Sequence, residues 1–383
     1  MLPRPTRCFT PRLLASALVP SARMLSGMPP STPLVPPDRQ PLLNARRCVI
    51  KVGTAVVSNP DGTLALSRMG ALVEQLVELV KQGRQVLLVS SGAVGLGRQR
   101  LGLAKDVVAN TANVIDRQAC AAAGQGILMS TYDMMLQRMG VTCAQVLITQ
   151  GDFLSRERYT NLTETLDRLA ALSVIPIINE NDVVTGCHQL DVQQVFSDND
   201  KLSALVAAGA DADGLALLTD VEGVYTKPPH EEGAERIKVW TQNMQVEIGE
   251  KSTMGRGGMA SKIGAASVAA SGGVHTVVAS GFDVANIERI FNGNDVGTLF
   301  TASDRPNKRK RWLTLATETK GSLWIKPDGI SKMMLGRIIH GGDVASLEGT
   351  FAVKDVVSLR SEDGEELARG VVQADSSALN AML

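Results

Sequence analysis

Between residues 47 and 300, short apolar runs rich in β-branched residues alternate with longer segments of helical periodicity. The apolar runs are nearly continuous in hydrophobic residues, as expected of strands that helices cover on both faces. This alternation predicts an α/β fold, a three-layer αβα sandwich around a mostly parallel central sheet. Ligands of such folds bind beyond the carboxyl ends of the strands. The expected strands are residues 48–52, 85–90, 142–148, 174–178, 214–219 and 274–279, and the expected helices are residues 66–81, 116–139, 159–171, 199–208 and 259–270.

The alternation stops after residue 300, which predicts a second domain. A basic run at residues 308–311 is followed by short strand-like pieces that glycines separate, at residues 322–325, 350–353, 356–359 and 368–372. We expect a larger domain over residues 44–304, followed along the chain by a small β-rich domain over residues 308–383. The basic run has two interpretations, a solvated linker or a patch for RNA binding or nuclear import.

Residues 1–43 are expected to form a disordered or targeting extension. The first 37 residues contain no Asp or Glu but do contain arginines, as a mitochondrial presequence does. Prolines leave only residues 12–19 uninterrupted for an amphipathic helix. A disordered tail, or a translation start placed upstream of the real one at Met28, explains the segment as well. We therefore expect a cytoplasmic protein, with the mitochondrion as the alternative. The arginines are Arg4, Arg7, Arg12 and Arg23.

The overall composition argues against several classes of function. Lys plus Arg and Asp plus Glu both number 39, so the zero net charge gives no global attraction to nucleic acid or to membranes. Aromatic residues make up 3%, too few for an aromatic RNA-binding platform, so RNA is not an expected partner. The 4 histidines lack paired ligand spacing, which argues against zinc. No apolar run approaches the roughly 20 residues that span a bilayer.

One short segment concentrates carboxylates and amides. Four carboxylates and three asparagines lie within about twenty residues of each other, following an apolar strand. Burying unpaired carboxylates costs several kcal/mol, so a packed core does not need this chemistry. Such a cluster suits a site that binds an amino group, orders lysines or holds Mg²⁺. The carboxylates are Glu180, Asp182, Asp198 and Asp200, and the asparagines are Asn179, Asn181 and Asn199.

Glycine turns at the ends of two expected strands are typical of anion-binding sites. Lys51 leaves the first strand beside Gly53, which places an ammonium next to exposed backbone N–H groups. The segment 90–97 closes the second strand and opens a helix, with Ser91 and Gly92 able to donate hydrogen bonds. Neither turn has the spacing of a dinucleotide fingerprint or of a P-loop. For the second turn, a simple tight strand–helix connection remains an alternative.

Two further segments have a possible role with a nucleotide. Thr219 and Asp220 end another strand, where they either bind a nucleotide or simply cap the strand. Residues 255–262 form a glycine-rich turn that feeds a helix with Lys262 in its first turn. A helix N-terminus repels cations by about 0.3–1 kcal/mol, so Lys262 makes most sense if an anion binds there too.

These elements together predict phosphoryl transfer. Attack of a carboxylate on ATP brings two anions together, and its catalysis is chiefly positioning and electrostatic stabilisation. Lys51, Lys262 and backbone N–H groups meet that need without a histidine. A carboxylate such as Asp200 can hold both lysines in place.

At the level of whole motifs, the chain resembles the glutamate 5-kinases, a group within the amino-acid kinase family. The similarity runs in order from about residue 46 to residue 302, and the pair of acidic motifs is its most specific part. The motifs are Lys51-Val-Gly-Thr, Val89-Ser-Ser-Gly-Ala-Val, Ile178-Asn-Glu-Asn-Asp, Ser197-Asp-Asn-Asp-Lys-Leu-Ser-Ala, Leu218-Thr-Asp and Gly255-Arg-Gly-Gly-Met-Ala-Ser-Lys.

The resemblance implies the amino-acid kinase fold and a set of residue roles. Lys51 and Lys262 would neutralise the transferring phosphoryl group and Asp200 would organise them. Ser91, Asp182 and Asn199 would bind glutamate, and no protein ligand for a metal is assigned. ATP would be held by Lys51, Gly53, Thr219, Asp220, Arg256, Gly257, Gly258, Met259, Ala260, Ser261 and Lys262.

The resemblance also implies an activity and its partners. The reaction would be phosphorylation of the glutamate side-chain carboxylate by ATP with Mg²⁺, the first step of proline synthesis. Proline would inhibit it, the protein would form homo-oligomers, and the product would pass to a glutamate-5-semialdehyde dehydrogenase. Residues 183–197 depart somewhat from the bacterial pattern. The tail from Arg309 onward resembles the start of a PUA domain and is shorter than a full module, which predicts a truncated one.

Two rival functions remain to be weighed against this interpretation. Another amino-acid kinase, acting for example on acetylglutamate or aspartate, would share the lysines and the glycine turns. Asp182 and Asn199 argue against it, because a free amino group on the substrate needs a carboxylate and an amide partner. The other rival is an RNA-binding PUA protein, which the zero net charge disfavours.

Overall fold

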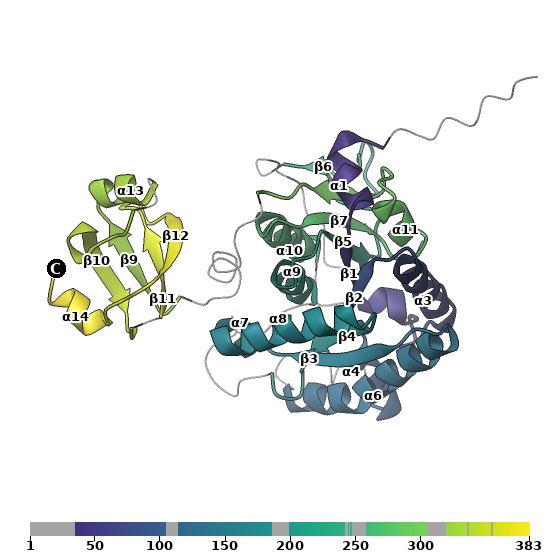
Figure 1. Ribbon diagram of the computed structural model, residues 1–383. Helices are drawn as coiled ribbons and strands as arrows, with labels where there is room; N and C mark the ends of the chain where they lie inside the picture. Colours follow the sequence, from purple (N-terminus) through teal and green to yellow (C-terminus); the bar gives the residue numbers. More distant parts are fainter. Residues whose placement is uncertain are drawn as a thin grey trace, which may run out of the picture. The chain divides into compact units, whose positions relative to one another are not determined.

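The computed structural model describes residues 35–104, 114–185, 199–241, 244, 246, 258–304, 319–334, 337–353 and 355–383. Its larger part is built on an eight-stranded sheet with the strand order β3-β4-β2-β1-β5-β7-β8-β6 (Figure 1). Neighbouring strands from β3 to β7 are parallel, whereas β8 runs antiparallel to β7. The strands are β1 (Arg47–Val52), β2 (Gln85–Ser90), β3 (Cys143–Ile148), β4 (Ile175–Glu180), β5 (Gly214–Thr219), β6 (Val239–Trp240), β7 (His275–Ser280) and β8 (Thr298–Phe300).

Helices cover both faces of this sheet and bury a separate core on each. Along β1, Ile50 belongs to one core and Val49 to the other, because successive side chains of a strand point to opposite faces. The three-layer α/β sandwich predicted from the sequence is therefore confirmed. One core is formed with α3 (Leu66–Lys81), α4 (Ala93–Arg100), α6 (Val114–Arg138) and α11 (Asn286–Phe291), and the other with α8 (Arg156–Ala171), α9 (Asn199–Gly209) and α10 (Met259–Ser271).

The strand order creates a crevice at the carboxyl end of β1. The chain moves from β1 to β2 on one side and later returns to place β5 on the other side. Crossovers that leave a strand in opposite directions open such a crevice, and ligands bind there. Lys51 pairs in register with Val89 of β2 and with Leu217 of β5, so it lies one residue from this edge.

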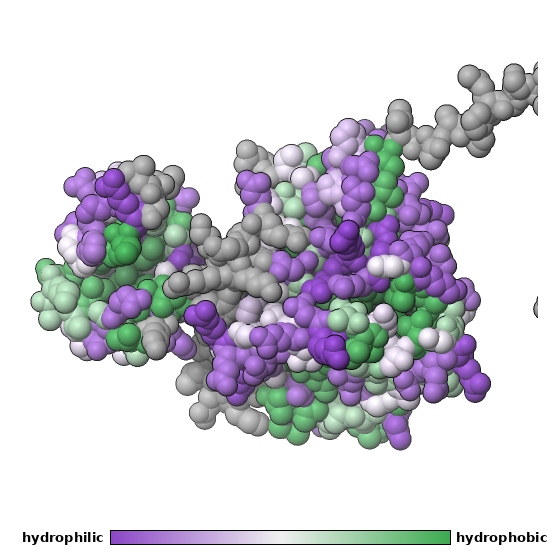
Figure 2. Space-filling model, viewed as in Figure 1, coloured by the Kyte–Doolittle hydropathy of each residue, from purple (hydrophilic) through white to green (hydrophobic). Residues whose placement is uncertain are grey.

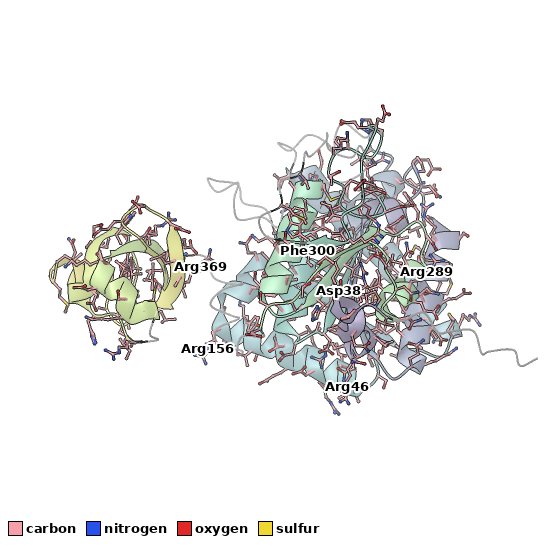
Figure 3. All side chains as sticks on the ribbon, turned by 90° about the horizontal axis from the view of Figure 1, so that it is seen from above. Asp38, Arg46, Arg156, Arg289, Phe300 and Arg369 are labelled. Atoms are coloured by element: carbon pink, nitrogen blue, oxygen red, sulfur yellow. The ribbon has the colours of Figure 1, made fainter. Side chains whose placement is uncertain are left out.

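The edge strand β6 and its neighbour β8 were not predicted from the sequence, because two or three residues are too few to show a periodicity. Side-chain packing stabilises these short strands. Phe300 stacks on Trp240 with ring centroids 5.4 Å apart, and Figure 3 shows Phe300 among the strands and helices of the larger part.

The assignment of residues 35–43 to an extension is wrong. They form the short helices η1 (Pro37–Arg39) and α1 (Gln40–Leu43), and Leu42 is fully buried in one of the two cores. Arg39 is also buried and donates hydrogen bonds to the carbonyl oxygens of Asn294 (3.0 Å) and Val296 (2.8 Å). We therefore propose that this domain starts near residue 35. Residues 1–34, with the predicted presequence, lie outside the described residues.

The second sheet has four strands in the order β10-β9-β11-β12. It encloses a small core of its own that includes Leu323, Ile325, Phe351 and Val357. The predicted β-rich C-terminal unit is thus present, although residues 350–353 are not a strand: Gly349 turns the chain at φ 92°, and Phe351 packs into the core instead. The elements are β9 (Gly321–Ile325), α13 (Pro327–Met334), η2 (Gly341–Asp343), β10 (Val344–Gly349), β11 (Val356–Arg360), β12 (Glu366–Val371) and α14 (Ser376–Asn380).

The surface agrees with the balanced composition. Figure 2 shows hydrophilic side chains over much of the visible face of the larger part, with apolar side chains gathered in small patches. Single exposed hydrophobic residues are normal on a protein surface. Within the described ranges, no helix combines the length and the apolar character needed to cross a bilayer. The basic run at residues 308–311 lies outside the described part of the chain.

Candidate active site

Two lysines and one aspartate meet at the carboxyl edge of the sheet. Lys51 comes from the end of β1, Asp200 from the first turn of α9 and Lys262 from the first turn of α10. Each oxygen of the aspartate takes one ammonium: Lys51 Nζ contacts Oδ1, and Lys262 Nζ lies 3.1 Å from Oδ2. All three residues are buried, with exposures of 3%, 0% and 8%. The structure therefore brings together the three residues that the sequence predicts as a catalytic group.

The local sequence explains why Lys51 and Asp200 share one face. Val49 and Lys51 are two residues apart on β1, so both point toward the layer that contains α9 and α10. Gly53 lies two residues after Lys51. Its backbone is extended, and the short helix α2 (Thr54–Val57) begins at the next residue. A Cβ on Gly53 would lie 3.8 Å from Lys51 Nζ, so the backbone passes close to the ammonium. An anion at this position could reach both the ammonium and the backbone.

A left-handed glycine shapes the turn after β2. Gly92 has a φ of 116° and precedes the first residue of α4. A Cβ at this position would lie 2.8 Å from Cγ2 of Val57, so a side chain is excluded by contact as well as by conformation. The turn is therefore more specific than the simple strand–helix connection that the sequence left open. It holds Ser91 directly beside β1, since the Ser91 N–H donates to the carbonyl oxygen of Val52 at 3.1 Å.

Asn199 joins the ends of two strands to the start of α9. Its Nδ2 shares its two hydrogens among three acceptors, the carbonyl oxygen of Ser90 (3.2 Å), Ser91 Oγ (3.0 Å) and Asn179 Oδ1 (2.9 Å). Asn199 directly precedes Asp200, so the same turn of helix places an amide next to the buried carboxylate. Ser91 and Asn199, two of the three residues predicted to bind glutamate, are thus in direct contact.

The third, Asp182, belongs to an acidic pair beyond β4. Glu180 ends the strand and is 5% exposed, and its Oε1 is a buried atom with no hydrogen-bond partner among the described residues. Burial, reinforced by the charge of Asp182, raises the pKa of Glu180 to about 8. Burial also raises the pKa of Asp182 to about 6, against the opposing charge of Arg117. At neutral pH the pair therefore carries less negative charge than its composition implies.

Arg117 was not predicted as a site residue. It lies in the first turn of α6, and burial lowers its pKa while the charges of Asp182 and Glu180 raise it. The sequence did contain a signal for it, because Arg117 lies near a helix N-terminus, where the helix dipole disfavours a cation. The same unfavourable position indicates a role for Lys262. An anion partner was needed to explain it, and the acidic pair is that partner.

The residues predicted for the nucleotide lie on the other side of β1. Thr219 ends β5, is buried, and its hydroxyl donates to Asp220 Oδ1 at 2.9 Å. Gly258, in extended geometry, precedes the first residue of α10, and the segment from Gly258 to Lys262 closes the first turn of that helix. Arg256 and Gly257 lie outside the described residues, as does Asp198. The local hydrogen bond of Thr219 leaves both interpretations of this strand end open.

Three groups of side chains therefore lie side by side at the carboxyl ends of the strands. Amides and carboxylates from β2, β4 and the start of α9 lie on one side, and the ends of β5 and α10 lie on the other. The trio formed by Lys51, Asp200 and Lys262 stands between them and carries one more positive than negative charge. Such an arrangement can hold an amino acid and a polyphosphate on opposite sides of two cations. Among the described residues, no group of three or more His, Cys, Asp or Glu side chains could hold a metal ion.

Comparisons with known proteins place the chain among kinases of small molecules. Residues 46–280 match the model of the amino acid kinase family. A glutamate 5-kinase of Cyanothece sp. is 41% identical over 340 residues, which cover 86% of this chain and 90% of that protein. Delta-1-pyrroline-5-carboxylate synthase 1 of Oryza sativa subsp. japonica is 43% identical over 277 residues, covering 70% of this chain but 39% of the relative. An isopentenyl phosphate kinase structure from T. acidophilum covers 66% of this chain and 99% of its own at 17% identity, with a TM-score of 0.46, too low to support a conclusion.

Proposed function

This chain belongs to the amino acid kinase family, within its glutamate 5-kinase group, and on that premise we propose that it phosphorylates L-glutamate. The reaction would convert ATP and the side-chain carboxylate of glutamate to ADP and L-glutamyl 5-phosphate, the first step of L-proline biosynthesis. The observation that carries the proposal is the buried trio of Lys51, Asp200 and Lys262, flanked by the contact between Ser91 and Asn199.

The trio suits the chemistry of an in-line phosphoryl transfer. A carboxylate oxygen of glutamate forms a bond to the γ-phosphorus while the bond from that phosphorus to the β–γ bridging oxygen breaks, and ADP leaves with the electron pair. No proton has to move, so two fixed ammonium groups can do what the reaction needs. Lys51 and Lys262 would lie against the γ-phosphoryl oxygens. Asp200 would hold both lysines in place without neutralising the pair.

The neighbouring polar residues suit the amino-acid end of glutamate. Ser91 and Asn199 offer a hydroxyl and an amide beside the trio, and Asp182 offers a carboxylate for the substrate ammonium. An ammonium partner would also counter the effect of burial on Asp182, whose pKa is raised to about 6 in the described structure. N-acetylglutamate has no ammonium and would leave Asp182 without that partner.

ATP would lie on the β5 side, held by Thr219, Asp220 and the turn from Arg256 to Lys262. We propose that Mg²⁺ arrives with the nucleotide. Mg²⁺ usually keeps several waters and binds substrate phosphates, using few protein carboxylates. The donor set of the described site, dominated by amides and two lysines, fits a metal held mainly by the ATP phosphates. The metal would neutralise phosphate charge during the transfer.

Regulation and assembly extend the proposal. We propose that proline inhibits the enzyme, that it works as a homo-oligomer, and that the acyl phosphate passes to a glutamate-5-semialdehyde dehydrogenase. The last point is supported by the relatives named delta-1-pyrroline-5-carboxylate synthase, of which this chain matches 39% or less in length. An acyl phosphate is a strong electrophile, so rapid use by a reductase is chemically reasonable.

A substrate panel tests the proposed activity. ADP release is measured with Mg²⁺, ATP and either L-glutamate, L-aspartate or N-acetyl-L-glutamate, and hydroxylamine traps the acyl phosphate as a hydroxamate. We expect strong turnover of glutamate alone. Equal or faster turnover of N-acetylglutamate would show that Asp182 does not select a free amino group, and the chain would then be a different amino acid kinase.

A further inference from the structure

A chain of side-chain amides extends from the candidate active site into α6. Asn199 Nδ2 donates to Asn179 Oδ1 at 2.9 Å, and Asn179 Nδ2 donates to Gln125 Oε1 at 2.8 Å. Gln125 comes from α6, 54 residues before its partner in sequence. Asn179 is 3% exposed, so the middle of this chain is buried. No residue role assigned from the sequence includes Gln125.

The direction of these hydrogen bonds is fixed by one backbone group. The carbonyl oxygen of Ser90 can only accept, so the Asn199 atom beside it must be Nδ2. The Asn179 atom facing that nitrogen must then be Oδ1, which turns Asn179 Nδ2 toward Gln125. Gln125 must in turn present its oxygen. All three amides therefore have a single consistent orientation, and Gln125 is the acceptor at its end.

This orientation decides which polar atoms remain for a ligand. Ser91 Oγ accepts a hydrogen bond from Asn199 Nδ2 at 3.0 Å, so the hydroxyl proton of Ser91 is available for another acceptor. The Nδ2 of Asn199 is engaged in the network, which leaves its Oδ1 as the acceptor on that side chain. A hydroxyl donor and an amide acceptor are what a carboxylate and an ammonium need from one amino-acid site.

Close helix packing holds Gln125 in place. Its neighbour Gly124 packs directly on α4, where a Cβ would lie 1.9 Å from the carbonyl oxygen of Ala93. In return, a Cβ on Gly97 of α4 would lie 1.7 Å from the carbonyl oxygen of Cys120 in α6. Ala93 is the first residue of α4 and follows Ser91 by two positions. The contacts thus form a closed ring from Ser91 through α4, α6, Asn179 and Asn199 back to Ser91.

We propose that Gln125 is a positioning residue for substrate recognition. By accepting from Asn179, it stabilises the orientation of the amide chain that the Ser90 carbonyl sets, so that the Ser91 hydroxyl donates to the substrate carboxylate and Asn199 Oδ1 accepts from the substrate ammonium. Gln125 itself contacts no substrate. The identity of that substrate as glutamate rests on the proposed function, whereas the polarity of the network rests on the hydrogen bonds alone.

Two substitutions at Gln125 separate polarity from packing. Gln125→Met keeps the length of the side chain but removes the acceptor, and Gln125→Glu keeps an acceptor oxygen. We expect Gln125→Met to lower kcat/KM for glutamate about tenfold, chiefly through KM, as the loss of one buried hydrogen bond predicts. The KM for ATP should stay within about twofold, and Gln125→Glu should recover most of the loss. Gln137→Met, an exposed position on the same helix, is the matched control.

The outcomes distinguish this inference from the proposed function. Equal effects of Gln125→Met on the KM values of glutamate and ATP, or no recovery by Gln125→Glu, would reduce Gln125 to a packing residue. If the wild type uses a different carboxylate in the panel, the proposed function fails, but the same KM ratio measured with that substrate still tests Gln125.

A double-mutant cycle needs no substrate at all. Gln125→Met and Asn199→Ala are compared singly and together for their effect on the free energy of unfolding in urea. If the amides form one network, the combined loss should be smaller than the sum of the single losses. Additive losses would overturn the inference whatever the enzyme phosphorylates.

Discussion

Two regions of the molecule gather cations around a single aspartate, and they differ in what else surrounds the cations. In the candidate active site, Lys51 and Lys262 contact the two oxygens of Asp200. Near β6 and β8, Arg39, Arg236 and Lys238 lie 3.4, 3.2 and 3.3 Å from Asp295. Figure 3 labels Asp38, the neighbour of Arg39, in this larger part of the molecule. By charge alone the two clusters look alike.

Their hydrogen bonds separate them. Arg39 donates hydrogen bonds to several backbone carbonyl oxygens, of which those of Asn294 and Val296 are the nearest. These backbone groups replace water around its guanidinium. Burial raises the pKa of Asp295, but hydrogen bonds from Arg236 and Lys238 outweigh this and lower it overall. That cluster joins the N-terminal segment to the edge of the sheet. Its excess of positive charge is therefore explained by the fold alone.

Lys262 differs from Arg39 in its place on a helix. It lies in the first turn of α10, where the helix dipole disfavours a cation, and it is 8% exposed. The contact with Asp200 offsets this unfavourable interaction with the helix dipole. A bound phosphate would interact favourably with both the ammonium and the helix N-terminus. The comparison therefore predicts that substitutions in one cluster change catalysis and those in the other change stability.

The largest expected effect concerns the trio. Lys51→Met or Lys262→Met should lower kcat by about 10²–10³, because each removes a cation that stabilises the transferring phosphoryl group. The melting temperature should change little, because Asp200 keeps the other lysine as its partner and no buried charge is left uncompensated. Steady-state ADP release and a thermal melt on the same preparations check both parts. A large fall in melting temperature with normal kcat would make the trio a structural cluster like that of Asp295.

Arg39→Met is the reciprocal test. It removes a buried guanidinium that bonds to carbonyl oxygens, so we expect a loss of about 3 kcal/mol in the free energy of unfolding. The kcat per folded molecule should stay within about twofold, because the described contacts of the cluster include none of the candidate site residues. Urea denaturation measures the first quantity and active-site titration the second. A tenfold fall in kcat without a loss of stability would break the comparison.

The N-terminal boundary of the larger domain gives a related prediction. A fragment of residues 35–304 should fold and phosphorylate glutamate, whereas a fragment of residues 44–304 loses both Arg39 and the fully buried Leu42. Burying one such leucine is worth about 2 kcal/mol, so the shorter fragment should melt well below the longer one. Differential scanning calorimetry of the two fragments checks this. Equal melting temperatures would restore the boundary at residue 44 that the sequence suggested.

The pH dependence of glutamate binding depends on Asp182. Its pKa is raised to about 6, so the carboxylate that should bind the ammonium is charged above that pH and neutral below it. The KM for glutamate should therefore rise about tenfold for each pH unit below the pKa, while Asp182→Asn has a high KM that changes little with pH. Initial rates between pH 5 and pH 8 test this. Parallel profiles for the two enzymes would remove Asp182 from the substrate site.

The smallest effect is expected at Glu180, which contacts no cation in the trio. Its pKa in the folded chain is about 8, against an ordinary value of 4.5, so the folded state holds the proton more tightly than the unfolded state. The stability that this proton provides is lost as the pH rises from about 4.5 to about 8, with roughly 2 kcal/mol of the loss between pH 6 and pH 8. Glu180→Gln cannot ionise and should show a flatter profile of stability against pH. An unchanged profile would mean that Glu180 is ionised when folded.

The sequence predicted the central sheet and the trio because both follow from local patterns. Continuous apolar runs mark strands that are buried on two faces, and Lys51, Asp200 and Lys262 each stand at the end of a strand or the start of a helix. Such positions converge at one edge of a parallel sheet whatever the loops between them do. The convergence needed no knowledge of the long-range contacts.

Two of the residues that were missed, Gln125 and Arg39, act through long-range contacts. Gln125 is a neutral residue on a helix without a distinctive pattern, and only its hydrogen bond to Asn179 reveals a role. Arg39 stands among prolines that suggested a disordered tail, yet its partners lie some 255 residues away in the sequence. No local propensity can signal a contact of that kind.

The central claim is that this enzyme joins a carboxylate oxygen of glutamate to the γ-phosphorus of ATP. The most direct measurement uses glutamate labelled with ¹⁸O in its side-chain carboxylate. The glutamyl phosphate cyclises when its own amino group attacks the carbonyl carbon, and the bridging oxygen leaves with the phosphate. Mass spectrometry should therefore find one ¹⁸O atom in each released phosphate. Unlabelled phosphate, formed at the same rate with or without glutamate, would show hydrolysis of ATP by water and would contradict the account.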